Sequence, residues 1–236
     1  MNLVLLEPED FVGETRALLS ARHHAHVTGV LRADVGDEIV VGRVGGAVGR
    51  GRVVAGADGA LLLDVELDRP PPPPMLVTLV LALPRPPVLR RVLSGVTAMG
   101  VKRIVLLGAR AVEKSFWQSH ALRAEAVREQ LVLGLEQARD TVLPEVLSRR
   151  RFRPFVEDEL PALLEGAAGF VAHPAPRTAP AGSVEEPALL AVGPEGGWSD
   201  HELELLVAAG LAPLGLGERP LRVETAVPAL LARFVR

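Results

Sequence analysis

The sequence predicts an α/β protein in which a small β-rich domain precedes a larger domain built on a mostly parallel sheet. Three observations lead to this fold class. Short β-rich stretches occupy the first 69 residues, five consecutive prolines follow, and from residue 75 onward apolar strands alternate with helical patterns. Such alternation is typical of a parallel sheet covered by helices. With 48% hydrophobic residues among 236, the chain can bury a sizeable core.

The first 69 residues are expected to form a small barrel or sandwich, because their β-rich stretches are separated by Gly and Asp turns. These stretches are residues 37–42, 47–56 and 60–68. The prolines at 70–74 cannot donate hydrogen bonds to a sheet and favour a stiff, extended chain. We therefore interpret residues 70–74 as a linker between a domain at 1–69 and a second at 75–236.

The second domain is expected to open with a strand, a helix and a strand. Residues 75–84 and 102–109 are apolar enough for buried strands, and residues 87–99 carry apolar side chains at helical intervals. Six further elements are expected: a long helix at about 120–141, strands at 169–175, 188–193 and 212–217, a helix at 199–209, and a last helix ending at Phe234.

Composition excludes several kinds of site. The chain contains no cysteine, so disulfides, thiol nucleophiles and thiolate metal sites are ruled out. The histidines of "HHAH" at 23–26 have no carboxylate at ligand spacing, and we expect no metal. The first ten residues carry no basic flank, and the longest apolar runs are about half the length of a membrane helix. These features favour a cytoplasmic protein without membrane contact.

Charge is distributed unevenly along the chain. Residues 75–155 carry 14 basic and 6 acidic side chains, whereas the segments before and after them are acidic. A basic band of this kind favours binding to a polyanion such as RNA. The alternative is codon bias, because Arg outnumbers Lys 24 to 2.

The stretch "GPEGG" at 193–197 stands between an apolar strand and a helix that begins with the capping box of Ser199 and Glu202. The cap explains the start of the helix but not the two glycines, which permit positive φ and close approach of a ligand to the backbone. Open α/β sheets bind ligands at the carboxyl ends of their strands. A purely structural turn is the alternative.

A second glycine-containing loop, "LGLGERPLRVETA" at 214–226, repeats the order of strand, glycines, proline and helix. Two such loops are expected to line one pocket. The alternative to a role in the pocket is that Glu224 and Thr225 only cap the start of the helix. His173 lies at the end of another predicted strand and is a third candidate for the pocket. The alternative is that His173 is an ordinary loop residue without a function. By contrast, "GRVGGAVGRG" at 42–51 runs into more strand, so it does not indicate a dinucleotide site.

Four stretches together resemble the RsmE family. They are "HVTGVLRADVGDEIVV", "GLEQARDTVLPEV", "LLAVGPEGGWSDHE" and "LGLGERPLRVETA", and they extend over nearly the whole chain. Members of that family are ribosomal RNA methyltransferases that make 3-methyluridine in small-subunit (16S) RNA with S-adenosylmethionine. The resemblance implies a PUA-like β-barrel that binds RNA, a SPOUT domain with a trefoil knot, and a homodimer. Knots are rare exceptions to normal topology.

The resemblance also assigns roles to residues. It implies that the two glycine loops hold the cofactor, with a third contribution near His173. We expect Arg222 to steady the negative charge that develops on uridine, and Glu224 to position Arg222 or to accept a proton. The expected cofactor-binding residues are His173, Gly193, Glu195, Gly196, Gly197, Leu216, Gly217, Leu221, Arg222 and Thr225.

RNA contacts are expected on the barrel and on the basic band, from Arg22, Arg32, Arg139 and Arg151. A solvated turn is the alternative for Arg32. The chain departs from the family at Gly95 and Ala98, where Lys and Glu are common, and at "SFWQSH" (115–120). Two other functions remain open: methylation of another nucleotide or a ribose oxygen, and RNA binding without catalysis.

Overall fold

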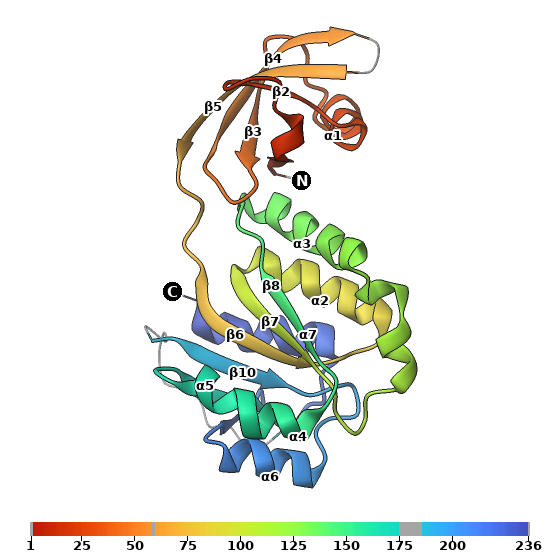
Figure 1. Ribbon diagram of the computed structural model, residues 1–236, viewed down its shortest axis with the longest axis vertical. Coiled ribbons are helices and arrows are strands. Elements are labelled where there is room, and N and C mark those ends of the chain that lie inside the picture. The colour runs from red at the N-terminus through yellow and green to blue at the C-terminus, as the bar shows by residue number, and fades with distance from the viewer. Residues whose placement is uncertain (1, 58–59, 175–185, 236) are drawn as a thin grey trace. The chain divides into compact units, whose positions relative to one another are not determined.

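The computed structural model describes residues 2–57, 60–174 and 186–235 (Figure 1). The chain forms two compact units. The amino-terminal unit comprises Met1–Pro73 and Val132–Leu143, and the carboxy-terminal unit comprises Pro74–Leu131 and Pro144–Arg236. A division at the prolines alone does not anticipate that residues 132–143 belong with the first unit.

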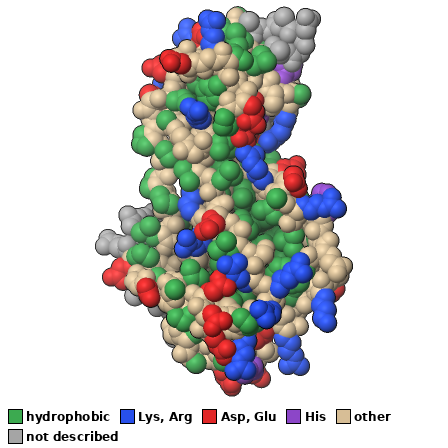
Figure 2. All heavy atoms as spheres, in the orientation of Figure 1, with side chains coloured by type: hydrophobic (Ala, Val, Ile, Leu, Met, Phe, Trp, Pro, Cys, Tyr) green, Lys and Arg blue, Asp and Glu red, His purple; other side chains and the backbone are tan. Residues whose placement is uncertain are grey.

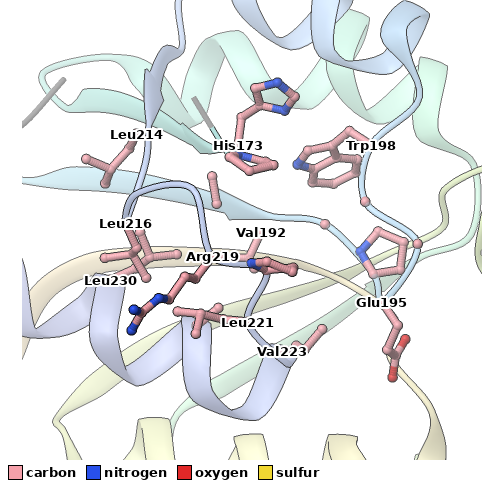
Figure 3. A pocket seen from close by; sticks show the side chains of 18 of the residues that line it. His173, Val192, Glu195, Trp198, Leu214, Leu216, Arg219, Leu221, Val223 and Leu230 are labelled. Atoms are coloured by element: carbon pink, nitrogen blue, oxygen red, sulfur yellow. The ribbon is translucent and has the colours of Figure 1, made fainter. Parts of the chain in front are cut away.

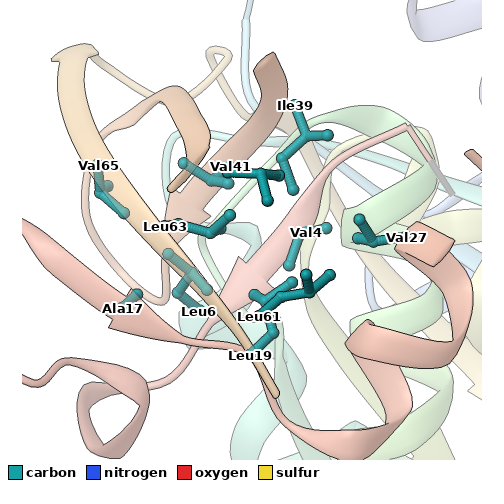
Figure 4. Packing of buried hydrophobic residues seen from close by; sticks show 11 residues of the cluster. Val4, Leu6, Ala17, Leu19, Val27, Ile39, Val41, Leu61, Leu63 and Val65 are labelled. Carbon is teal, nitrogen blue, oxygen red and sulfur yellow. The ribbon is translucent and has the colours of Figure 1, made fainter. Parts of the chain in front are cut away.

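The amino-terminal unit contains a five-stranded sheet in the order β1-β3-β4-β5-β2. Its strands are β1 (Val4–Leu6), β2 (Arg16–Leu18), β3 (Glu38–Arg43), β4 (Val48–Ala57) and β5 (Ala60–Arg69). All neighbours are antiparallel except β1 and β3. The strands β3, β4 and β5 lie where the sequence predicts strands. Figure 4 shows Val4, Leu6, Val41 and Leu63 converging with Val27 in one buried cluster.

Short helical segments join these strands. They are η1 (Pro8–Asp10), α1 (Ala21–His26) and the π-helical turn η2 (Val27–Leu31). Val27 is fully buried, and it brings this helical segment onto the sheet. Among the described residues, no group of three or more potential metal ligands occurs.

Residues 132–143 complete the amino-terminal unit through a buried carboxylate. Glu136 is 1% exposed, and its Oε2 accepts a hydrogen bond from Arg22 Nη2 at 2.5 Å. Its Oε1 lies 2.9 Å from Nε2 of His23, which is also buried. Val132 and Leu135 pack against Leu3 beside this polar group. A buried polar group is tolerated only when it has hydrogen-bond partners, and here Arg22 and His23 of α1 supply them.

The carboxy-terminal unit is built on a six-stranded sheet in the order β11-β9-β10-β6-β7-β8, and every neighbouring pair is parallel. The predicted parallel sheet is confirmed. Its strands are β6 (Met75–Ala82), β7 (Val101–Leu107), β8 (Glu145–Arg149), β9 (Ala168–Ala172), β10 (Ala188–Val192) and β11 (Ala212–Leu214). The central strand β10 is buried at all five positions, as expected for a strand covered on both faces.

Helices cover both faces of this sheet (Figure 1). They include α2 (Pro86–Ala98), α4 (Phe152–Pro154), α5 (Leu160–Leu164), α6 (Asp200–Ala208) and α7 (Val223–Leu231). The helix α3 (Ala124–Ala138) begins in this unit and continues into the amino-terminal unit from Val132 onward. The helices α2 and α7 pack together on one side, while α5 and α6 lie on the other, against β10 and β9. None of the described helices is long and apolar enough to cross a membrane.

Two segments of the carboxy-terminal unit differ from the sequence prediction. The long helix expected at 120–141 is shorter, because the 3-10 helices η3 (Lys114–Gln118) and η4 (His120–Leu122) precede α3. The strand β8 and the helical segment that follows it, including η5 (Phe155–Glu159), were not anticipated. As an edge strand, β8 has no buried residue and no apolar pattern to mark it. Residue 175, the last of one predicted strand, lies outside the described residues.

We expect Arg22→Ala to lower the free energy of unfolding, because it leaves the buried Glu136 carboxylate short of a partner. Breaking a fully buried pair costs about 3–5 kcal/mol, so we expect about 1–2 kcal/mol for this half-exposed arginine. Urea denaturation measures the change. Arg16→Ala is the control, since its ion pair with Asp64 is exposed on both sides. Equal effects of the two variants would show that Glu136 does not depend on Arg22.

Candidate functional site

A cavity of about 380 Å³ opens at the carboxyl ends of β9, β10 and β11, in the carboxy-terminal unit (Figure 3). Parallel pairing places these three strand ends at the same edge of the sheet. The walls are three loops and one side of α7. The lining residues are Ala172, His173, Pro174, Val192, Gly193, Pro194, Glu195, Gly196, Gly197, Trp198, Leu214, Leu216, Gly217, Arg219, Pro220, Leu221, Val223, Ala226 and Leu230.

The loop after β10 is shaped by its glycines. Gly197 has a φ of +72°, and its N–H donates to the Pro194 carbonyl at 2.8 Å, which closes a tight turn. A Cβ at Gly193 would lie 3.2 Å from the backbone nitrogen of Trp198 and 3.3 Å from its indole Nε1. Glycine is therefore favoured at 193, where a Cβ would make tight contacts, and at 197, where φ is positive.

Glu202 anchors this loop. The predicted capping box is present: the Ser199 hydroxyl accepts from the Glu202 N–H, and the Glu202 carboxylate accepts from the Ser199 N–H at 2.9 Å. The same carboxylate also accepts from the Arg110 N–H at 2.7 Å, across 92 residues of sequence. Because Glu202 is only 6% exposed, these bonds are shielded from water and hold the loop after β10 against the loop after β7.

The opposite wall is formed by residues 214–223. The His173 N–H donates to the Leu214 carbonyl at 3.1 Å, so the ends of β9 and β11 are fixed to each other. Figure 3 shows Leu214, Leu216 and Leu230 directed toward the cavity. The walls are thus mostly apolar, with backbone groups between them, which is the usual composition of a small-molecule site.

Comparison with known proteins assigns the family. Residues 71–235 match the family described as RNA methyltransferase domain. The chain is 30% identical to Ribosomal RNA small subunit methyltransferase E of Treponema pallidum, over 98% of this chain and 90% of the relative. The protein of the same name from Synechocystis is also 30% identical, over 98% of this chain and 76% of the relative. The chain belongs to the RsmE family. The resemblance found in the sequence is confirmed, and the protein is an RNA methyltransferase.

Solved structures share the fold over the whole chain. One is Ribosomal RNA small subunit methyltransferase E from Neisseria gonorrhoeae bound to S-adenosyl methionine, with a TM-score of 0.75, 22% identity, and coverage of 98% of this chain and 95% of the other. Another is a putative methyltransferase from Legionella pneumophila in complex with the same cofactor, with a TM-score of 0.77, 21% identity, and coverage of 99% and 96%. At these identities the similarity shows the fold alone.

Most of the site residues expected from the RsmE resemblance border the cavity. They are His173, Gly193, Glu195, Gly196, Gly197, Leu216, Gly217 and Leu221. Arg222 and Thr225 are not among the lining residues that the structure describes. Both are exposed at the start of α7, where the Arg222 carbonyl accepts from the Thr225 N–H at 2.9 Å. Glu224, the other expected catalytic residue, is likewise outside the lining.

Glu224 is held ionised by its surroundings. A hydrogen bond from its own backbone N–H lowers the pKa of the Glu224 carboxyl, although desolvation opposes this shift. The hydrogen bond from Arg91 at 3.1 Å and the charges of Arg91 and Arg222 lower the pKa further. Arg91 comes from α2, so the pair also joins the two helices that pack together.

Trp198 and Arg219 line the cavity and lie within the predicted motifs, but neither was expected as a site residue. Trp198 directly follows the glycines, and its buried Nε1 has no hydrogen-bond partner among the described residues. Arg219 lies in the second loop and reaches the cavity (Figure 3). The sequence contains a signal that could have identified Trp198 as a lining residue. A tryptophan directly after two glycines has a large ring that can fill the space left by the missing side chains.

The arginines expected to contact RNA are in different settings. Arg22 is paired with Glu136, as described above, although 46% of its side chain is exposed. Arg32 and Arg139 are exposed, and both have left-handed backbones, with φ of 53° and 56°. Arg151 is exposed and precedes α4 in the carboxy-terminal unit.

We expect Glu202→Ala to destabilise the carboxy-terminal unit by about 2–3 kcal/mol, since it removes a helix cap and the bond to Arg110 together. Thermal and urea unfolding measure this loss. Glu204→Ala is a matched control, because Glu204 is an exposed glutamate on the same helix and its loss should change stability by less than about 0.5 kcal/mol. If the two variants unfold alike, Glu202 does not anchor the loop.

Proposed function

We propose that this protein transfers a methyl group from S-adenosylmethionine to N3 of uridine in small-subunit ribosomal RNA. The observation that carries the proposal is that the two glycine loops, at 193–197 and 214–221, border a single cavity. The similarity to two proteins named Ribosomal RNA small subunit methyltransferase E supports the ribosomal substrate, and two structures of the same fold that hold S-adenosylmethionine support the cofactor.

The cavity fits the cofactor. Its volume of about 380 Å³ lies within the range of small-molecule sites, which is about 300–1,000 Å³. Gly193, Gly196 and Gly217 expose backbone groups that suit an adenosine, and the unpartnered Trp198 Nε1 supplies a donor. When bound, the cofactor supplies a methyl group on a sulfonium, which needs orientation more than covalent help. His173, Gly197, Leu216 and Leu221 complete the proposed binding residues, with Thr225 beyond the rim.

Glu195 is proposed to act through the loop that it holds. Its carboxylate accepts a hydrogen bond from the Arg85 N–H at 3.1 Å, at the start of α2. This bond joins the loop after β10 to the loop after β6. Glu195 therefore positions the cofactor-binding backbone, and its exposed carboxylate need not touch the cofactor.

The chemical difficulty is the proton on uridine N3, because its loss leaves negative charge on the ring. We assign Arg222 to stabilise that charge by a charge-assisted hydrogen bond. We assign Glu224 to position Arg91 and Arg222, since a carboxyl with a lowered pKa is a weak proton acceptor. Arg91 is hydrogen-bonded to Glu224, and the charge of Arg222 also acts on this carboxylate, which favours a fixed position for the catalytic guanidinium while the base enters.

RNA contacts are proposed for Arg32, Arg139 and Arg151. A left-handed backbone costs a non-glycine residue about 1–2 kcal/mol, and glycine is the usual residue at such helix ends. That Arg32 and Arg139 both keep this conformation favours a role for their side chains. Arg22 is a weaker candidate, because its charge is already balanced by Glu136.

The proposal extends to the architecture of the family. We expect a PUA-like barrel in the amino-terminal unit, a trefoil knot in the carboxy-terminal unit, and a homodimer in the cytoplasm. Light scattering of the purified protein measures its oligomeric state.

Nucleoside mass mapping tests the activity. Ribosomal RNA from cells with and without this protein, and RNA treated with the pure enzyme, should differ by one 3-methyluridine. A methyl group on another base or on a ribose oxygen would replace the proposed product. Unchanged RNA together with S-adenosylmethionine binding would indicate a non-catalytic factor and would refute the proposal.

Arg222→Ala should lower turnover by about 100-fold, as loss of one transition-state donor commonly does, while cofactor affinity changes little. The reason is that Arg222 lies outside the cavity lining. Single-turnover methylation and calorimetric titration of S-adenosylmethionine measure the two quantities. Parallel losses of turnover and affinity would place Arg222 in the cofactor site instead.

Arg32→Gly and Arg139→Gly should weaken RNA binding without loss of stability, because glycine relaxes the left-handed backbone. Each lost phosphate contact should reduce the slope of log affinity against log salt by about 0.7–0.9. RNA titrations at several salt concentrations and urea denaturation give both values. Arg16→Ala serves as control, since this exposed arginine is already paired. Unchanged slopes would leave these arginines without a part in binding.

A further inference from the structure

The carboxyl edge of the parallel sheet has two chemically different halves. Over β11, β9 and β10 it carries the cavity and its glycines. Over β6, β7 and β8 it carries arginines and an aromatic segment that the cavity does not use. Figure 2 shows Lys and Arg side chains gathered on the side of this unit where β6, β7 and β8 end in Figure 1.

The second half carries cations without ion pairs. Within the described parts of the chain, six basic side chains from the loops after β6, β7 and β8 are exposed and have no ion pair. They are Arg85, Arg110, Lys114, Arg123, Arg150 and Arg151. Other arginines of the same unit are neutralised, for example Arg149 by Glu159 and Arg153 by Glu157. Glu113 is an exposed acid among them, so positive charge predominates locally without being exclusive.

Trp117 lies within this group. It belongs to η3, between β7 and α3, and the Arg150 guanidinium lies over its ring at 5.5 Å from the centroid. The arginine can cover only one face of the indole, and Trp117 is only partly buried. Phe116 and His120 are its neighbours in the same segment. Aromatic side chains interleaved with cations are the common feature of surfaces that hold single-stranded nucleic acid.

The basic half continues directly to the rim of the cavity. A Cβ at Gly196 would lie 3.1 Å from Cβ of Ala111, so the loop after β7 touches the glycine loop. The Arg110 N–H bonds to Glu202, and the Arg85 N–H bonds to Glu195. These backbone bonds leave the guanidinium groups of both arginines free. An RNA strand bound over β6, β7 and β8 would therefore have to cross only one loop to reach the cavity.

We propose that Trp117, Arg110, Lys114 and Arg150 bind a single-stranded segment of the substrate RNA beside the methylated nucleotide. Trp117 stacks on a base, while the three cations contact phosphates. A single strand is favoured over a duplex, because a paired base inside an A-form helix cannot stack on a side chain. This inference rests on the proposed function and adds a substrate-binding surface that the glycine loops do not provide.

The test uses the full-length protein and an RNA of about 12 nucleotides with mixed sequence, within the range of about 4–16 for such surfaces. Trp117→Leu should weaken its binding at least about fivefold, and Trp117→Phe should retain most of it, because a stacked base needs a ring. Arg110→Ala and Arg150→Ala should each reduce the salt slope by about 0.7. Arg103→Ala is the matched control, since Arg103 is paired with Glu145.

Fluorescence separates stacking from a merely structural role of Trp117. In a Trp198→Phe background Trp117 is the one remaining tryptophan, since the chain has two. The single-stranded RNA should then quench its emission, and the same RNA annealed to its complement should not. Each variant is also melted, and Trp117→Leu, Arg110→Ala and Arg150→Ala are titrated with S-adenosylmethionine, where unchanged values show that the fold and the cavity are intact.

Equal binding by Trp117→Leu and wild type, or equal affinity for duplex, would overturn the inference. So would RNA binding without quenching. These outcomes are distinct from failure of the proposed function, in which wild-type protein would bind the single strand normally and yet leave ribosomal RNA unmethylated.

Discussion

The parallel pairing of β10 with both β6 and β9 is the constraint on which the site depends. Because all three strands point the same way, the loops that follow them open at one edge of the sheet. An antiparallel β10 would send residues 193–198 to the opposite edge, away from His173 and from the second glycine loop. The hydrogen bonds of Glu202 and Glu195 then fix the positions of these loops, since each carboxylate accepts a hydrogen bond from the backbone of a neighbouring loop. Strand direction places the loops, and two carboxylates hold them there.

The two halves of that edge solve different physical problems. A small ligand that lies against backbone needs glycines and apolar surroundings, and the cavity over β11, β9 and β10 is lined mostly by apolar side chains and glycines. A polyanion needs unpaired cations in contact with solvent, because burial would make their desolvation prohibitive. Because the apolar cavity and the cationic surface lie on adjacent loops, a small ligand and a polyanion can meet there. The cations stay in contact with solvent, and the cavity keeps its apolar walls. The contact of Ala111 with Gly196 marks the boundary between them.

Features specified by residues close together in the sequence could be predicted, whereas contacts between residues far apart in the sequence could not. The glycine loops, the capping box and the buried strands were predictable, because each is specified by residues within one turn or strand. The bond from Arg110 to Glu202 spans 92 residues and that from Arg22 to Glu136 spans 114, and no local pattern announces either. The strand β8 was missed because its residues are only partly buried. Residues 132–143 continue a helical pattern, and the pattern does not reveal that Glu136 joins the amino-terminal unit.

The basic band illustrates the same limit in electrostatic terms. Counting charges over residues 75–155 identifies an excess of arginine but treats every arginine alike. In the folded chain Arg91, Arg103, Arg149 and Arg153 are paired with glutamates, so they contribute little net field. Six unpaired cations lie on the loops after β6, β7 and β8, while Arg90 on α2 and Arg139 after α3 are also exposed without an ion pair among the described residues. Ion pairing neutralises several arginines of the band, and six of the cations that it leaves unpaired lie on the loops at the edge where the cavity opens.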